Sequence, residues 1–374
     1  AVVDCISGAG GSDSLIFTYT IANGHSSIDL DYTDTTALDL NGGTIRDVAR
    51  NPANLILFSP DSTGSLAANK AIVVDGIVPA ATSVSFVSNN TYNPSLSTPG
   101  NLVTISLVMS EAIQTPTATI GGNDVTITGS NTNWIITRSM TSSDVSGSVG
   151  FTFDFIDLAG NSGDQITSTT DGSVVTFDKT APVITAVTLV SDNTFDPSLS
   201  MVGDTVTVTM VASESTQSPA VTIGGTIATV SGEGTTWTAV RALTAEDTEG
   251  VIALSIDYLD LAGNAGAQTT ATTDGSVVTF DKTVPTFTTV SMVSNNANTA
   301  LAMVGDTVTV TMVTSESTQS PAVTIGGTIA TVSGEGTTWT AVRALTSDDT
   351  EGTVTLSIDY LDLAGNAGAQ TTAA

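Results

Sequence analysis

An internal repeat of 102 to 103 residues runs through most of this chain and limits the folds open to it. Residues 201–210 reappear unchanged as residues 303–312, and residues 213–219 reappear as residues 315–321. One tryptophan falls in each copy, at Trp134, Trp237 and Trp339. Solenoid repeats are shorter, at about 20–45 residues. The period therefore indicates a tandem array with one β-sandwich per copy.

The copies predict four domains. Residues 1–78 form a diverged, truncated immunoglobulin-like unit, residues 79–180 and 181–283 form complete repeats, and residues 284–374 form a repeat that lacks its last strand. In an earlier copy, residues 173–177 supply that strand. We expect the chain to be a segment of something longer. The alternative is that another molecule lends the missing strands.

Apolar residues alternate with polar ones, as in half-buried strands. The alternation includes Val103, Ile105 and Leu107, and it recurs at Phe151 and Phe153. Gly-Asp, Gly-Gly and Asp-Gly pairs punctuate these runs, and no window has a sustained helical period. Seven or so short strands in about 100 residues are typical of an immunoglobulin-like sandwich. We expect an all-β chain of tandem immunoglobulin-like β-sandwich domains in an extended array.

The charge balance excludes several classes of partner. Eight Lys and Arg stand against 37 Asp and Glu, for a formal net charge of −29. Nucleic acids and anionic membranes both attract basic surfaces, so neither is an expected partner. No apolar run reaches the roughly 18 residues that span a bilayer, so we expect no membrane insertion. Cys5 is the one cysteine, which excludes an internal disulfide, and we expect a small buried thiol.

Two acidic phrases mark the domain junctions. Asp75, Asp178 and Asp281 lie in the linkers, 103 residues apart each time. The phrase Asp-Leu-Ala-Gly-Asn occupies residues 157–161 and returns at 260–264 and 362–366. In a seven-stranded sandwich, the loop that carries Glu111 and the turn that begins at Asp157 lie at the pole where the preceding linker arrives. Three carboxylates distant in sequence are therefore expected to converge there.

Such a group of carboxylates needs a counter-charge, and calcium supplies one through six to eight oxygen ligands. We expect the same convergence at the next two junctions, and Asn161, Asn264 and Asn366 can add oxygen ligands. Asp154, Asp257 and Asp359 lie on the outer face of their strands and are weaker candidates. A plain β-turn is the alternative for each phrase, because Asp, Gly and Asn favour turns. The carboxylates expected to converge at the second junction are Asp178, Glu214 and Asp260. Those expected at the third junction are Asp281, Glu316 and Asp362.

A strand ending in Ser-Glu, an Asp-x-Ala-Gly-Asn turn and a closing Asp-Lys-Thr-Ala-Pro resemble the bacterial immunoglobulin-like repeat domains of giant secreted surface adhesins. The resemblance covers residues 79–374 well and residues 1–78 partly. It implies an extracellular, cell-surface location and calcium at the domain junctions. Within residues 1–78, Arg50 stands in place of the turn glycine. The implied calcium ligands are Asp75, Glu111, Asp157 and Asn161, then Asp178, Glu214, Asp260 and Asn264, then Asp281, Glu316, Asp362 and Asn366.

The resulting functional prediction is mechanical. We expect a stalk whose partners are calcium ions and neighbouring domains, and the alternative is a filament or sheath subunit that joins other copies by strand exchange. An enzyme is not expected, because the single histidine, His25, lies in a loop-like context and the acidic motif is copied in every repeat. Each tryptophan is expected in a core rather than on a carbohydrate platform. Weak surface pairs are expected between Arg138, Arg241 and Arg343 and nearby acids such as Asp144, Glu246 and Asp348.

Overall fold

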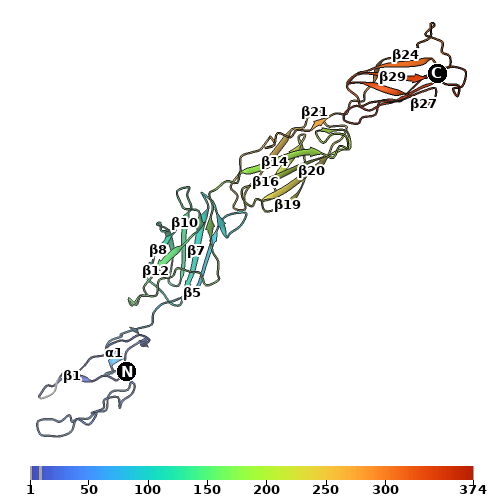
Figure 1. Cartoon of the computed structure of the whole chain (residues 1–374). Helices are drawn as coiled ribbons and strands as arrows, with labels where there is room; N and C mark the ends of the chain where they lie inside the picture. The colour runs from blue at the N-terminus through green and yellow to red at the C-terminus, as the bar shows by residue number, and fades with distance from the viewer. Residues whose placement is uncertain (1, 8–10, 374) are drawn as a thin grey trace. The chain divides into compact units, whose positions relative to one another are not determined.

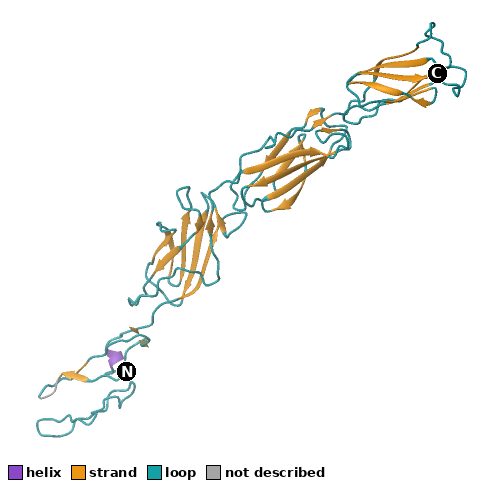
Figure 2. Cartoon of the chain, in the orientation of Figure 1, coloured by secondary structure: helices purple, strands orange, loops and turns teal. Residues whose placement is uncertain are grey.

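The computed structural model describes residues 2–7 and 11–373. The chain divides into two compact units, one ending at Lys179 and the other beginning at Thr180. Strands make up nearly all the regular structure of the described residues (Figures 1 and 2). No helix among these residues is long and apolar enough to cross a membrane.

The first unit begins with short elements that build no sandwich. They are β1 (Cys5–Ser7), β2 (Ile16–Phe17), β3 (Ser26–Ser27), α1 (Leu66–Asn69) and β4 (Val74–Asp75). β1 pairs with β2, and β3 pairs with β4. Among the described residues before residue 79, the buried apolar side chains are Ala67 and Val74. This part therefore lacks a hydrophobic core of its own.

Two sequence predictions are wrong in this part. Only strands were expected, but α1 forms after Ser65, whose side-chain oxygen accepts a hydrogen bond from the Ala68 amide at 3.2 Å. A serine in this position caps the first turn of a helix. Cys5 was expected to be buried, but it is exposed. No core lies beside it to cover the thiol.

The rest of the first unit is a β-sandwich. One sheet has the order β5-β7-β10-β9, and the opposite face is formed by β8 with β12 and by β11-β13-β6. Ile105, Ile136 and Phe153 come from the two faces, meet in one core cluster and are fully buried. The strands are β5 (Ala81–Ser88), β6 (Leu96–Ser97), β7 (Leu102–Met109), β8 (Thr117–Ile120), β9 (Thr126–Ser130), β10 (Asn133–Ser139), β11 (Gly147–Ser148), β12 (Phe151–Asp154) and β13 (Thr176–Phe177).

The second unit contains two more sandwiches. In the first of them, the sheet β14-β16-β20-β19 faces β18-β17-β22, and β15-β23-β21 closes one side. In the second, β24-β25-β29-β28 faces β27-β26-β30-β31. The strands of the first are β14 (Ile184–Ser191), β15 (Leu199–Ser200), β16 (Thr205–Ala212), β17 (Ala220–Ile223), β18 (Thr226–Ile227), β19 (Thr229–Glu233), β20 (Thr236–Ala242), β21 (Gly250–Val251), β22 (Leu254–Asp257) and β23 (Thr279–Phe280). Those of the second are β24 (Phe287–Ser294), β25 (Thr307–Thr314), β26 (Ala322–Ile325), β27 (Thr328–Ile329), β28 (Thr331–Glu335), β29 (Thr338–Ala344), β30 (Leu356–Asp359) and β31 (Thr371–Ala373).

Each sandwich has its own core cluster, and alternate residues of the central strands point into it. On β7, for example, Val103, Ile105 and Leu107 are buried. This pattern is the period of two that a strand with one buried face requires. The chain is therefore an all-β protein built from tandem immunoglobulin-like β-sandwiches. The exact domain boundaries stay a prediction.

The three tryptophans belong to these cores. Trp134, Trp237 and Trp339 are 5%, 8% and 8% exposed. The indole nitrogen of Trp237 donates to the Thr216 hydroxyl at 2.8 Å, and that of Trp339 donates to the Thr318 hydroxyl at 2.9 Å. Buried indoles with a hydrogen-bond partner are packing residues. The prediction of core packing is confirmed.

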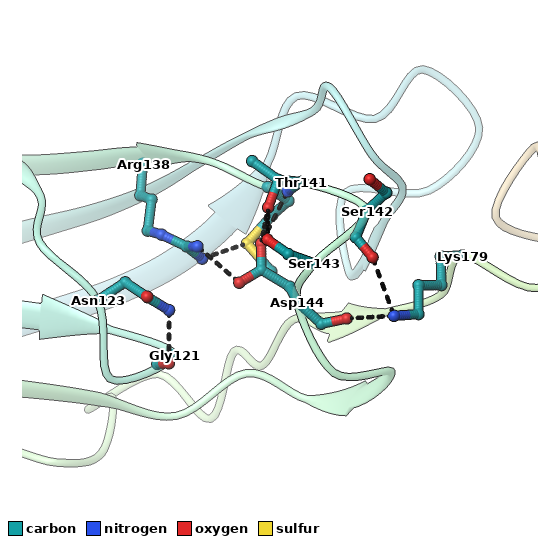
Figure 3. Close-up of polar contacts among 9 residues, drawn as sticks. Gly121, Asn123, Arg138, Thr141, Ser142, Ser143, Asp144 and Lys179 are labelled. Carbon is teal, nitrogen blue, oxygen red and sulfur yellow. Dashed lines mark hydrogen bonds and ion pairs between the residues drawn. The ribbon is translucent and has the colours of Figure 1, made fainter.

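A buried ion pair recurs in every sandwich. Arg138 Nη2 lies 2.6 Å from Asp144 Oδ1, and the two side chains are only 11% and 9% exposed. Figure 3 shows this pair beside Lys179, whose amino group donates to the carbonyls of Ser142 and Asp144. The linker lysine thus binds the same loop that holds the ion pair.

The sequence prediction for the other two arginines is wrong in partner and in strength. Arg241 pairs with Asp247 rather than Glu246, and Arg343 pairs with Asp349 rather than Asp348. Asp247 also accepts a hydrogen bond from the Thr244 amide at 2.8 Å, which turns its carboxylate inward. Side-chain exposures of 10–18% make these pairs largely buried rather than surface contacts.

Candidate metal centre

Each Asp-Leu-Ala-Gly-Asn phrase forms a tight hairpin turn. In the first, the Asp157 amide donates to the Asn161 carbonyl at 3.0 Å. Asp157 Oδ1 accepts from the amides of Gly160 at 2.6 Å and Asn161 at 2.8 Å. Gly160 has φ +101°, in the left-handed region that favours glycine. These bonds form the turn without any metal.

The first part of the chain provides an internal comparison. Asp47 Oδ1 accepts from the Asn51 amide at 2.7 Å, and Asp47 Oδ2 accepts from Asn51 Nδ2 at 2.8 Å. Arg50 takes the left-handed conformation here, with φ 69°. Asp47 is exposed and belongs to none of the acidic groups found among the described residues. The turn alone therefore does not create a metal site, and the neighbouring carboxylates decide whether one exists.

Within the first unit, the expected carboxylates do meet. Asp75 comes from β4, Glu111 follows β7, and Asp157 follows β12. One carboxylate oxygen of each lies within 4.8 Å of the others. Asp157 is fully buried. The side-chain nitrogen of Asn161, Nδ2, also donates to the backbone carbonyl of Asp75 at 3.1 Å, which ties the turn to the linker.

Within the second unit, Asp281, Glu316 and Asp362 form the corresponding group, again with oxygens within 4.8 Å of one another. Asp362 is 1% exposed. The side-chain nitrogen of Asn366, Nδ2, donates to the backbone carbonyl of Asp281 at 3.1 Å, so the tie between turn and linker recurs. The same three elements, a linker, the loop after the second long strand and the hairpin turn, supply the carboxylates in both units.

The remaining predicted residues divide between the units. Asp178 lies at the end of the first unit, whereas Glu214 and Asp260 lie in the second. Asp260 is 1% exposed and accepts hydrogen bonds from the amides of Gly263 and Asn264, as in the other turns. Asp260 therefore keeps the local geometry of the turn.

Burial and mutual repulsion raise the pKa of the loop glutamates. Burial raises the pKa of Glu111, and the charges of Asp75 and Asp157 raise it further. The pKa of Glu316 is raised by burial and then by the charges of Asp281 and Asp362, with Glu249 adding to them. Ionised together, these groups oppose one another, because like charges disfavour the charged form.

The turn aspartate behaves differently. Burial raises the pKa of Asp157, but hydrogen bonds from the Asn161 side chain and from the amides of Asn161 and Gly160 bring it below its usual range. A carboxylate that accepts several such bonds stays ionised. The group in the first unit thus keeps at least one buried negative charge near neutral pH.

The linker lysines do not neutralise these groups. Lys282 Nζ donates to the carbonyls of Ala245 and Asp247, both at 2.8 Å. Lys179 binds the equivalent carbonyls in the first unit. The three Arg–Asp ion pairs contain none of the carboxylates of these two groups. Both acidic groups therefore lack a protein counter-charge in direct contact.

The oxygens of these groups fit a hard divalent cation. Glu316 Oε1 is buried and has no hydrogen-bond partner, although buried polar atoms are nearly always paired. Calcium accepts carboxylate, carbonyl and water oxygens at about 2.3–2.6 Å and tolerates irregular geometry. Asp75, Glu111 and Asp157 could hold it in the first unit, and Asp281, Glu316 and Asp362 could hold it in the second.

The turn asparagines were predicted as oxygen ligands, which stays a prediction, and in the structure their side-chain nitrogens donate hydrogen bonds. Asn161 Nδ2 donates to Asp157 Oδ2 at 2.6 Å as well as to the Asp75 carbonyl. Asn366 Nδ2 likewise donates to Asp362 Oδ2 at 2.8 Å, and Asn264 Nδ2 donates to Asp260 Oδ2 at 2.7 Å. The side-chain nitrogen of each asparagine thus points at the aspartate of its own turn and stabilises that turn.

The outer-face aspartates lie outside the acidic groups. Asp154, Asp257 and Asp359 are exposed, and each accepts a hydrogen bond from a glutamine eleven residues later, at 2.9 Å in the first two copies and 2.7 Å in the third. They therefore behave as the solvated side groups that strand parity suggested.

Two kinds of supporting residue were missed. Gln114 Nε2 donates to the Asp157 carbonyl at 2.9 Å, and Gln217 and Gln319 repeat this contact. Their signal was the recurrence of a glutamine three residues after each loop glutamate. Glu249 accepts from the Lys282 amide at 2.8 Å and from the Thr283 hydroxyl at 2.7 Å. Its loop approaches the linker only in the folded sandwich.

In the calcium-free protein, lowering the pH from about 7 to about 5 should increase thermal stability. The folded-state pKa values of Glu111 and Glu316 are raised, so protonation favours the folded state, and the gain appears as the pH falls through the raised values. Below about pH 4, carboxylates with a lowered pKa, such as Asp247, lose their interactions and reverse the trend. Melting curves of the calcium-depleted protein test this. A steady loss of stability from pH 7 to 5 would contradict it.

No protein-family model and no curated protein matches this sequence. Among solved structures, the I9–I11 tandem from titin covers 74% of this chain and 93% of its own chain, at 11% identity and a TM-score of 0.29. The D00-D0 domain of intimin covers 53% and 100%, at 13% identity and 0.22. SGBP-B of the Bacteroides ovatus mixed-linkage glucan utilization locus covers 79% and 70%, at 16% identity and 0.18. At these TM-scores, the fold assignment rests on the strand pairing of this chain alone.

Proposed function

We propose that this chain is a structural extender segment of a bacterial cell-surface adhesin and that calcium stiffens its domain junctions. One observation carries the proposal. A linker aspartate and two loop carboxylates of the following sandwich meet within 4.8 Å in the first unit, and they do so again in the second. An ion bound to all three would join the linker to the next sandwich and restrict the joint.

The physical basis is the change in charge at the joint. Two unit charges about 4 Å apart repel by about 4 kcal/mol at an effective dielectric constant near 20. Calcium would replace this repulsion by attraction to each carboxylate. Pro79 and Pro285 follow Asp75 and Asp281 by four residues and restrict the backbone torsions of the same linkers. We therefore expect stiff joints with calcium and looser joints without it.

Catalysis is not part of the proposal. His25 Nδ1 lies 2.7 Å from the Tyr19 hydroxyl and accepts a hydrogen bond from the Ala22 amide at 3.2 Å, so it contributes to a local turn. The carboxylates are arranged alike in two units rather than paired in one distinctive site. Repetition of one motif suits a mechanical role, and an extracellular location suits calcium binding of modest affinity.

Small-angle scattering with calcium and again after chelation tests this function. We expect chelation to shrink or broaden the distribution of interatomic distances, while the strand signal in circular dichroism persists. Magnesium is the matched control ion, because its smaller octahedral shell suits three converging carboxylates poorly. An unchanged scattering profile would remove calcium stiffening from the proposal.

A further inference from the structure

The alanine of the repeated Asp-Leu-Ala-Gly-Asn phrase is buried in one turn and open in another. Ala159 in the first unit is exposed. Ala364, its counterpart in the last sandwich of the second unit, is only 1% exposed. Both turns have the same internal hydrogen bonds, from the glycine and asparagine amides to the aspartate. The burial of Ala364 therefore comes from a part of the chain outside its own turn.

That part is the segment of residues 192–201, which follows β14 in the preceding sandwich of the second unit. Asn193 Nδ2 donates to the Ala364 carbonyl at 2.8 Å. Gly365 lies against the same segment, because a Cβ added to it would fall 2.6 Å from the Phe195 ring and 3.4 Å from Met201 Sδ. The segment thus approaches the backbone of the turn so closely that position 365 has no room for a side chain.

The segment is held in shape by its own hydrogen bonds. Asn193 is 8% exposed, and its Oδ1 accepts from the Phe195 amide at 2.9 Å. Its Nδ2 also donates to Asp204 Oδ2 at 2.7 Å. Asn90 holds the corresponding segment of the first unit in the same way, since its Oδ1 accepts from the Tyr92 amide at 2.9 Å. These bonds lie within one sandwich, so the segment presents a preformed surface to the turn.

We propose that Asn193, Phe195 and Met201 form a docking socket for the Ala-Gly turn of the sandwich that follows in the chain, and that this contact persists without calcium. The socket offers an N–H donor to the alanine carbonyl and an apolar wall to the glycine. It selects a partner turn with small residues at these two positions. The inference goes beyond calcium stiffening and does not depend on it, because none of the three socket residues belongs to an acidic group.

The joint within the second unit then has two separate ties. The acidic group joins Asp281 of the linker to the sandwich of residues 284–374, and the socket joins the preceding sandwich to it directly. A hydrogen bond between neutral groups and a close apolar contact need no ion. Chelation should therefore loosen the first tie and leave the second. This also gives the alanine and glycine of the phrase a function that the turn and the carboxylates do not explain.

The test is hydrogen exchange of the whole chain, read at residues 192–201 with calcium and after chelation. We expect protection of this segment to persist after chelation. In the calcium-free protein, Gly365→Ala should speed exchange there by at least about tenfold, because the added methyl group would collide with Phe195. Gly160→Ala is the matched control. Its φ is +101° against +102° at Gly365, but its added Cβ meets nothing within 4 Å, so it should speed exchange only in its own turn.

Phe195→Ala separates the collision from the backbone strain of the turn. Phe195 is 50% exposed, so its loss should leave the sandwich folded. In the Phe195→Ala background, adding Gly365→Ala should change exchange at residues 192–201 by no more than about twofold, because residues in contact have non-additive effects. Phe195→Ala alone should also speed exchange at residues 362–366, a result that does not require Gly365→Ala to fold.

Fully additive effects of the two substitutions would overturn the proposal, because turn strain alone would then explain Gly365→Ala. Loss of protection at residues 192–201 on chelation would overturn it as well, because the contact would then depend on the ion. The calcium proposal fails on a different measurement, an unchanged scattering profile after chelation. Failure of the socket and failure of calcium stiffening are therefore distinguishable.

Discussion

Replacing Glu316 by glutamine should stabilise the calcium-free protein and weaken its binding of calcium. The side chain keeps its size but loses the charge that opposes Asp281 and Asp362. Without the ion, the loss of repulsion should raise the melting temperature of the last sandwich by a few degrees. With the ion, the loss of one carboxylate ligand should lower affinity by about tenfold or more. Calorimetric titration and thermal melting with and without calcium measure the two effects.

Glu335→Gln is the matched control, because it removes one negative charge from an exposed position on β28 of the same sandwich. It should change neither quantity beyond the small effect of net charge. Glu316→Gln is expected to raise the melting temperature without calcium and to lower the calcium affinity, so each measurement can contradict the proposal by itself. If Glu316→Gln destabilised the calcium-free protein, the glutamate would be a structural hydrogen-bonding residue. If calcium affinity stayed unchanged, Glu316 would not be a ligand.

The second large effect is expected at the buried ion pair. Asp247→Ala should destabilise the sandwich of residues 181–283 by about 3–5 kcal/mol, because it leaves the Arg241 guanidinium buried without its counter-charge. Burial raises the pKa of Asp247, but hydrogen bonds from Arg241 and Thr244 lower it overall, so the pair is ionised at neutral pH. Hydrogen exchange of β20 peptides measures the loss, with β10 as an internal reference in the first unit.

Glu246→Ala is the control for this experiment. Glu246 is the neighbouring exposed acid, and its removal should change stability by no more than about 0.5 kcal/mol. Equal effects of the two substitutions would show that charge in this loop, rather than the buried pair, stabilises the sandwich. Loss of the linker contact would be a separate result, because Lys282 binds the carbonyls of Ala245 and Asp247 rather than their side chains.

The fold class could be predicted because its signals are local or repeated. Strand β7 spans Leu102–Met109, as the alternation predicted. The two acidic groups could also be predicted, because strand direction alone brings the linker, the loop and the hairpin turn to the same end of a sandwich. These groups are Asp75, Glu111 and Asp157 in the first unit, and Asp281, Glu316 and Asp362 in the second. The short helix α1 could not, since four residues show no helical period.

The sequence by itself determined the internal repeat, the all-β class and the convergence of Asp75, Glu111 and Asp157, because periodicity and strand direction need no side-chain coordinates. Only the tertiary structure decided the rest. It turned Asp247 rather than Glu246 toward Arg241, aimed the Asn161 amide nitrogen at the carboxylates, and left the residues before 79 without a core. The physical reason is that these outcomes depend on rotamers and on packing between distant segments, which adjacent residues in a sequence do not specify.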